Sequence, residues 1–260
     1  MKNMKNKMII FGIAIVLMGV LTAFSRRDGD EFSYKQTENY IIGFKHLESI
    51  HLTQQDDLIR VYPDLQQGLI DSDLAWNEHY RDVEYSRLIE QYGADGYPQT
   101  VAFGGGFPQF EYVYPDYMSV DLLTSDDYDS SHPAGSSLSD IACFYASSPI
   151  HFIKSRYEKP AAFQTYLQDD TYAGNIYLFA LSIDPSEVHE QTPVTGLLSE
   201  LGAEDFVLLY CSSLGLPQAV IRLTQAPAKA GTYPLTLVAT GVNGTKYSAQ
   251  LDYRFGSPAE

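Results

Sequence analysis

The chain has few basic residues and few cysteines, and both shortages limit the functions that it can have. Its 260 residues hold 17 lysines and arginines against 33 aspartates and glutamates, a net charge of −16. Phosphate backbones and anionic lipids would repel this charge, so we expect no nucleic-acid partner and no peripheral docking on a membrane. The cysteines are Cys143 and Cys211, each in an apolar stretch. They can form a disulfide in an exported protein or stay two buried thiols, and the sequence leaves both open.

Familiar catalytic motifs are lacking as well. The chain has no Gly-x-Ser-x-Gly elbow and no Ser-x-x-Lys. His189-Glu190 is followed by Gln191-Thr192-Pro193, which is not the zinc-protease pattern. We therefore predict no catalytic and no cofactor-binding residue, and we favour a binding or structural module over an enzyme. A glycan hydrolase that uses two carboxylates as acid and base is the first alternative.

The N-terminus, residues 1–25, has the layout of a signal peptide. Three lysines precede an apolar run from Met8 to Phe24, and a polar stretch begins at Ser25. An uncleaved membrane anchor is the alternative, and the body is exported in either case. We predict a location in the periplasm, the outer membrane or at the cell surface, with residues 26–39 as a flexible tether.

The end of this leader begins like the signal for lipoprotein processing. Leu21-Thr22-Ala23 calls for a cysteine next, because the cysteine sulfur takes the diacylglycerol, but residue 24 is phenylalanine. As written, the chain cannot be lipidated at Phe24. We expect membrane contact only through the leader, in the case that the leader is not cleaved.

Alternation of apolar and polar residues predicts strands over much of the remaining chain. The clearest case is the half-buried strand over 247–255, which Asn243-Gly244 joins to a strand over 231–240 in the pattern of a β-hairpin. Shorter strand patterns lie at 40–52, 118–123, 176–183, 206–211 and 219–223.

One helix is predicted near 71–92, because apolar residues recur there at helical spacing and Asp71-Ser72-Asp73 suits a helix start. The predicted fold class is therefore mainly β, an antiparallel β-sandwich with an Ig-like C-terminal hairpin. It occupies residues 40–256 as one domain, with two lobes that meet near 185–205 as the alternative.

Asp126, Asp127 and Asp129 are the best candidates for a metal site. Calcium prefers several oxygen ligands from one loop. The glycine and terminal glutamate of the EF-hand are missing, so a solvated acidic loop is the favoured interpretation. A calcium-stabilised structural domain stays open as a second alternative function, with calcium as the cofactor.

Aromatic residues gather at Tyr112, Tyr114 and Tyr117, beside Phe107 and Phe110. Exposed rings at these positions would stack on a sugar or a peptide, which suggests a glycan or an envelope protein as partner. Ordinary packing of rings within strands is the favoured interpretation.

The stretch 121–140 has a distinctive order of residues. Thr124-Ser125 is followed by an acidic run and then by the turn Pro133-Ala-Gly-Ser-Ser-Leu-Ser-Asp140. In this it resembles a family of uncharacterised Bacteroidota lipoproteins, the DUF5034-like group, over residues 112–256. The resemblance implies a lipoprotein-type leader, an envelope location and a β-sandwich, with no known activity and no catalytic residues. Phe24 departs from that pattern and puts lipid anchoring in doubt.

Overall fold

The structure is a computed structural model, and it describes residues 33–34, 41, 43–66, 70–71, 83–96, 101–102, 111–158, 176, 181, 191–211 and 216–256. The predicted leader and Phe24 lie outside these residues. No helix in the described ranges is both long and apolar enough to cross a membrane.

The chain divides into two compact units. Residues 1–36 and 98–107 form the first, in which β1 (Ser33–Tyr34) pairs antiparallel with β5 (Val101–Ala102). Two residues of the predicted tether therefore belong to a strand. Residues 37–97 and 108–260 form the second unit, which holds the other described elements.

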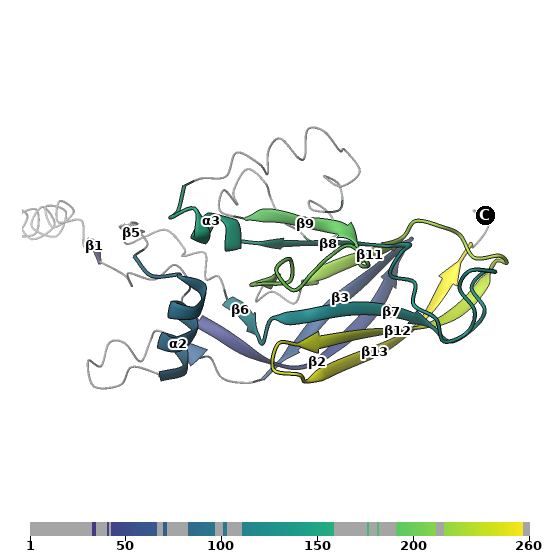
Figure 1. Cartoon of the computed structure of the whole chain (residues 1–260), viewed down its shortest axis with the longest axis horizontal. Helices are drawn as coiled ribbons and strands as arrows, with labels where there is room; N and C mark the ends of the chain where they lie inside the picture. The colour runs from purple at the N-terminus through teal and green to yellow at the C-terminus, as the bar shows by residue number, and fades with distance from the viewer. Residues whose placement is uncertain are drawn as a thin grey trace, which may run out of the picture. The chain divides into compact units, whose positions relative to one another are not determined.

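The second unit is built from two sheets (Figure 1). The larger has the order β10-β6-β2-β3-β11-β8-β9, with β4 also paired to β2. Its strands are β2 (Gly43–Gln55), β3 (Leu58–Leu65), β4 (Ile70–Asp71), β6 (Glu111–Tyr114), β8 (Ala142–Ser148), β9 (Thr192–Leu197), β10 (Tyr210–Cys211) and β11 (Ala219–Leu223). The smaller sheet has the order β13-β12-β7, from β7 (Tyr117–Thr124), β12 (Gly231–Gly241) and β13 (Lys246–Phe255). The pairs are antiparallel except β2 with β6, which is parallel.

The predicted C-terminal hairpin is confirmed. β12 and β13 pair in register from Gly231 opposite Phe255 to Thr240 opposite Lys246. Gly244 supplies the positive φ of 83° that the connecting turn needs, and the Asn243 side chain accepts the Thr245 N–H. Side chains alternate along β12 between buried and half-buried, so one face of this sheet enters the core.

Strand β2 shows why the stretch 40–52 lacks clean alternation. The pairing with β3 slips at Glu48, between Leu47 and Ser49. One extra residue reverses which side chains face inward, so Leu47 is followed in the core by Ile50 and Leu52.

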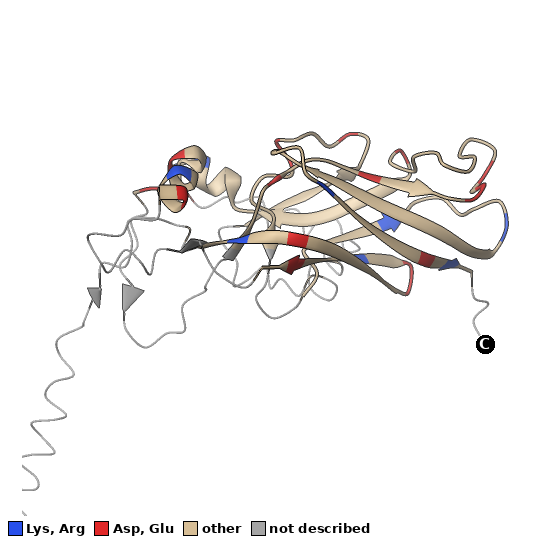
Figure 2. Cartoon of the chain, turned by 90° about the horizontal axis from the view of Figure 1, so that it is seen from below, with Lys and Arg blue, Asp and Glu red and all other residues tan. Residues whose placement is uncertain are grey.

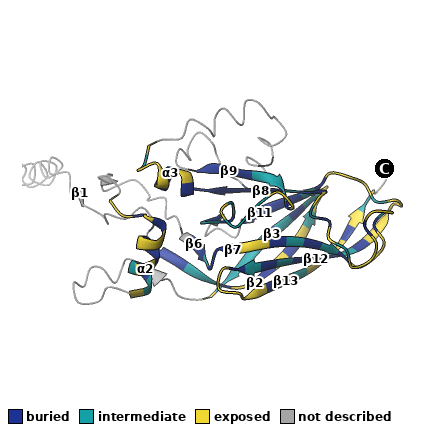
Figure 3. Ribbon diagram, in the orientation of Figure 1, coloured by how far each residue is buried: buried dark blue, intermediate teal, exposed yellow. Residues whose placement is uncertain are grey.

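Buried apolar side chains form two clusters within the second unit. Figure 3 marks the buried positions along its strands and helices. The larger lies between the sheets and joins residues such as Leu122 and Leu235 of the smaller sheet to Ile59 and Ile221 of the larger. This packing of two mainly antiparallel sheets is the predicted β-sandwich. The smaller cluster packs α2 (Val83–Tyr92) against residues that include Phe44 and Tyr112. The other helix of the described ranges is α3 (Ile150–Lys154).

Three predicted elements need correction. The predicted helix near 71–92 is confirmed only as α2, because Asp71 pairs with Gly43 in β4 and residues 72–82 lie outside the description. Most of the predicted strand 176–183 also lies outside it, but the Leu181 N–H donates to the Ile176 carbonyl, a helical-turn bond rather than a strand bond. The predicted strand 206–211 shrinks to β10, since residues 203–208 form turns and Leu208 has a φ of 50°.

Candidate functional site

The segment between β7 and β8, residues 125–140, forms the most elaborate polar structure of the sandwich; we call it the acidic loop. Its second half folds back along the free edge of β7. The Leu138 N–H donates to the Leu122 carbonyl at 2.7 Å, and the Thr124 N–H donates to the Ser136 carbonyl at 3.0 Å. The Gly135 N–H in turn donates to the Thr124 carbonyl at 2.7 Å. This backbone pairing gives the loop a fixed path and covers part of an otherwise open sheet edge.

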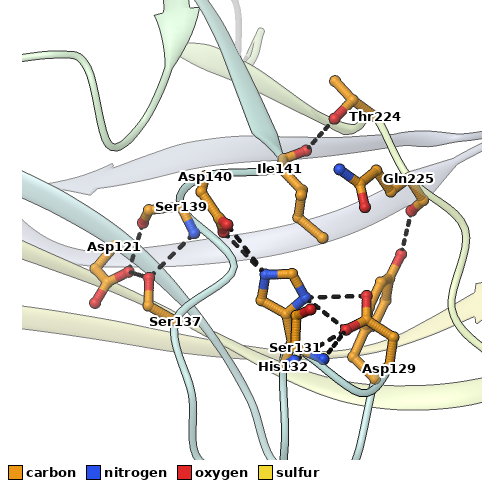
Figure 4. Close-up of polar contacts among 11 residues, drawn as sticks. Asp121, Asp129, Ser131, His132, Ser137, Ser139, Asp140, Ile141, Thr224 and Gln225 are labelled. Atoms are coloured by element: carbon orange, nitrogen blue, oxygen red, sulfur yellow. Dashed lines mark hydrogen bonds and ion pairs between the residues drawn. The ribbon is translucent and has the colours of Figure 1, made fainter.

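His132 lies at the centre of this loop, with 6% of its surface exposed. Its Nδ1 is 2.9 Å from Oδ1 of Asp129, and its Nε2 is 3.0 Å from Oδ1 of Asp140 (Figure 4). Carboxylates only accept, so both ring nitrogens can donate only when the imidazole is protonated. The hydrogen bond to Asp129, followed by that to Asp140, raises the pKa of His132 above its usual 6.5, against the opposing effect of burial. In its protonated form, His132 is thus a charged bridge across the loop.

Asp129 also organises the local turn. Its Oδ1 accepts the N–H of Ser131 at 2.7 Å and the N–H of His132 at 2.9 Å. The hydrogen bond from the imidazole is the main reason that the pKa of Asp129 is lowered from 3.8, and the two backbone donors add to it. An aspartate that accepts N–H groups two and three residues further along is a common turn former.

Further bonds tie the acidic loop to the strands on either side (Figure 4). Asp121, on β7, accepts hydrogen bonds from the hydroxyls of Ser137 and Ser139, both at 2.6 Å. The buried Tyr128 donates its hydroxyl to the carbonyl of Gln225, beyond the end of β11, at 2.5 Å. The loop is therefore anchored to both sheets of the sandwich.

Two of the three carboxylates predicted to bind calcium accept hydrogen bonds within this loop. Oδ1 of Asp127 accepts the N–H of Ala134 at 2.9 Å, and Asp129 holds His132. Asp126 is exposed. Within the described ranges, no group of three or more histidine, cysteine, aspartate or glutamate residues is placed to hold a metal ion. The structure thus does not bring the three together as a ligand set, because the loop's own donors take two of them.

The three predicted binding tyrosines do not form an exposed platform. Tyr112 is fully buried and Tyr117 is 5% exposed, where its hydroxyl donates to Oε1 of Gln218 at 3.1 Å. Tyr114 is half-buried, with the Arg87 guanidinium 5.9 Å from its ring centre. Tyr112 and Tyr117 pack in the core as strand residues do, which agrees with the favoured interpretation and leaves no exposed stacking ring at these two positions. Phe107 and Phe110 lie outside the described residues.

The two cysteines are not joined in this structure. Cys143 on β8 is a half-buried free thiol, opposite Arg222 on one neighbouring strand and Leu197 on the other. Cys211 lies on β10 opposite Glu111. The alternative of a free Cys143 thiol is the one that this structure has.

A second polar centre lies beside α2, and sequence reasoning missed it. Asp116, 6% exposed, follows β6. Its Oδ2 accepts the Tyr92 hydroxyl at 2.7 Å and its Oδ1 accepts the Leu208 N–H at 2.8 Å. Burial raises the pKa of Asp116 from 3.8 to about 6, although both hydrogen bonds lower it. Both carboxyl oxygens are occupied, so this acid is placed to hold segments together. No local sequence signal separates it from the other acidic residues.

No family model, no curated protein and no solved structure matches the chain. The class of protein therefore rests on the fold and the acidic loop alone. It is a β-sandwich that carries a hydrogen-bonded polar loop at one end.

Proposed function

We propose that the protein is an exported, envelope-associated binding module without catalytic activity, and that the acidic loop is its recognition surface. The observation that carries the proposal is the bridge from Asp129 through His132 to Asp140. A loop held on a rigid sandwich loses little conformational entropy when it binds, because its ordering precedes binding.

The chemistry of the exposed side chains favours a partner with basic groups. Asp126 and Asp140 are exposed, as are Ser125, Ser130 and Ser131. Figure 2 shows acidic positions on the loops at the end of the sandwich away from α2. Complementary charge on an envelope protein would speed encounter and fix its orientation. The envelope location rests on the signal-peptide layout of residues 1–25.

Aromatic stacking on a glycan has less support. The described large hydrophobic side chains that are exposed are Val83, Met118 and Val242, and none of them is aromatic. The proposal therefore moves the recognition surface from the tyrosines to the acidic loop.

A charge-reversal pair tests this assignment. The full chain, D126K and E90K are expressed in the native host, and partners are captured by cross-linking in the intact envelope. Glu90 is an exposed acid on α2, so E90K makes the same charge change away from the loop. We expect D126K to lower the yield of the main cross-linked partner severalfold and E90K to leave it unchanged. Equal yields for all three proteins, or equal losses for both variants, would overturn the assignment.

A further inference from the structure

Asp116 connects three segments that are far apart in the sequence. Its carboxyl group holds Tyr92, the last residue of α2, and the N–H of Leu208, just before β10. Its own carbonyl accepts the N–H of Val242, in the turn between β12 and β13, at 2.9 Å. One buried residue thus joins the helix to both sheets.

The helix is held on the unit by packing and by a few side-chain hydrogen bonds, of which the bond to Asp116 is one. α2 buries Tyr85, Leu88, Ile89 and Tyr92 in the smaller hydrophobic cluster. With ten residues it is too short to be stable alone in water, so its stability comes from packing. The described bonds from its side chains to the rest of the unit include those of Tyr92 to Asp116, Tyr85 to the Ile41 carbonyl and Arg87 to the Tyr114 hydroxyl.

We propose that Asp116 is a pH-sensitive latch, which holds α2 and its hydrophobic cluster on the sandwich and loosens as Asp116 ionises. The proposal is independent of the function assigned to the acidic loop.

Ionisation of Asp116 loosens the latch because the charged carboxylate is more stable in water than in its buried position. A carboxylate is solvated better in water than between a phenol and one backbone N–H, so an open state that exposes Asp116 gains more from ionisation than the closed state. The raised pKa of Asp116, about 6 against 3.8, agrees with this geometry. The latch is then tightest below pH 3.8 and weakens as the pH rises to about 6, by at most on the order of a hundredfold in the opening equilibrium.

The ionisable groups around Asp116 change the pKa of its partner Tyr92. Burial raises the pKa of Tyr92 most, Asp116 and Tyr114 on β6 raise it further, and Arg87 on α2 lowers it. Tyr92 therefore stays a neutral donor throughout the range in which Asp116 titrates. Further out, His46 is 3.7 Å from Glu84 and contacts the Tyr114 ring.

Amide hydrogen exchange of the full chain tests the latch. Protection factors are compared at pH 4.5 and pH 7.5 for Leu88 and Ile89 on α2, with Leu237 on β12 as the internal reference. In the wild type we expect protection of the α2 amides to fall about tenfold or more relative to Leu237. In D116N, which keeps an acceptor for the Leu208 N–H but cannot ionise, this pH dependence should disappear. Equal relative protection at both pH values, or the same dependence in D116N, would overturn the proposal.

A second measurement decides the matter even if D116N does not fold. The Asp116 carboxyl carbon is titrated by carbon-13 NMR in the wild type and in Y92F. We expect a midpoint well above 3.8 in the wild type and a higher one in Y92F, because Y92F removes a donor that favours the ionised form. A wild-type midpoint at or below 3.8, or an unchanged midpoint in Y92F, contradicts the latch.

Discussion

His132 in the acidic loop and Asp116 at the α2 end of the sandwich are two buried titratable groups in opposite arrangements. At the loop, the imidazolium of His132 is buried between two carboxylates that reach toward solvent. Beside α2, a carboxyl group is buried between two uncharged donors. At His132 the hydrogen bonds outweigh burial and favour the charged form, whereas at Asp116 burial outweighs the two hydrogen bonds and disfavours it. The balance between burial and partners therefore decides protonation at each group.

Both arrangements nevertheless predict lower stability as the pH rises, in different windows. The pKa of His132 is raised, so its contribution is complete below pH 6.5 and is lost as the pH rises through its folded pKa. The pKa of Asp116 is raised as well, so its contribution is complete below pH 3.8 and is lost by about pH 6. As the pH rises, the α2 end of the sandwich therefore loses its stabilising contribution at lower pH than the acidic loop does.

The largest expected effect is that of removing the imidazole. His132→Ala leaves Asp129 and Asp140 without their shared donor, and we expect it to lower the free energy of unfolding by about 2 kcal/mol at pH 5.5. Urea denaturation measures the change. His151→Ala is the matched control, because His151 is exposed on α3 and should lie within about 0.5 kcal/mol of wild type. Equal effects of the two variants would show that the bridge contributes nothing.

Removing the Tyr92 hydroxyl beside Asp116 should lower the free energy of unfolding somewhat less than removing the His132 imidazole. Tyr92→Phe leaves one oxygen of a buried carboxylate without a donor, and we expect a loss of about 1–2 kcal/mol at pH 8 and a smaller loss at pH 4. Tyr62→Phe serves as the control, since no described residue bonds to the Tyr62 hydroxyl. A loss that is independent of pH would mean that Tyr92 acts only by packing.

The pH dependence of stability sharpens the comparison further. We expect the free energy of unfolding to fall in two steps, between pH 4 and 6 and again above pH 6.5, each no steeper than about 1.4 kcal/mol per pH unit. Denaturation curves across this range measure it. Asp116→Asn should remove the lower step alone and His132→Ala the upper step alone. A variant that removes both steps would refute the separation of the two ends.

The smallest effect on stability is expected for the contact between Asp140 and His132. The Asp140 side chain is 63% exposed, so Asp140→Asn should cost less than about 1 kcal/mol at pH 5.5. It should also lower the pKa of His132, because Asp140 is one of the groups that raise it. NMR titration of the imidazole gives the second readout, and an unchanged midpoint would assign the whole bridge to Asp129.

Local patterns in the sequence predicted the sandwich but not its polar centres. The hairpin of β12 and β13 was predictable because its alternation and its Asn-Gly turn lie within one stretch of chain. The bulge at Glu48 hid the register of β2, since one extra residue reverses the alternation. The Asp116 centre joins residues 24 and 92 positions away, and no local pattern encodes such contacts. The acidic run was visible, but its bonds to the Ala134 N–H and to His132 depend on the path of the loop, which no local pattern gives.

The protonation of His132 is the central claim, and nitrogen-15 NMR of its imidazole tests it most directly. The titration is followed from pH 4 to 9 in the full chain. Our account predicts that both ring nitrogens carry protons at pH 6.5 and that the midpoint lies above 6.5. A neutral ring with one N–H at pH 6, or a midpoint at or below 6.5, would contradict the bridge that holds the acidic loop in place.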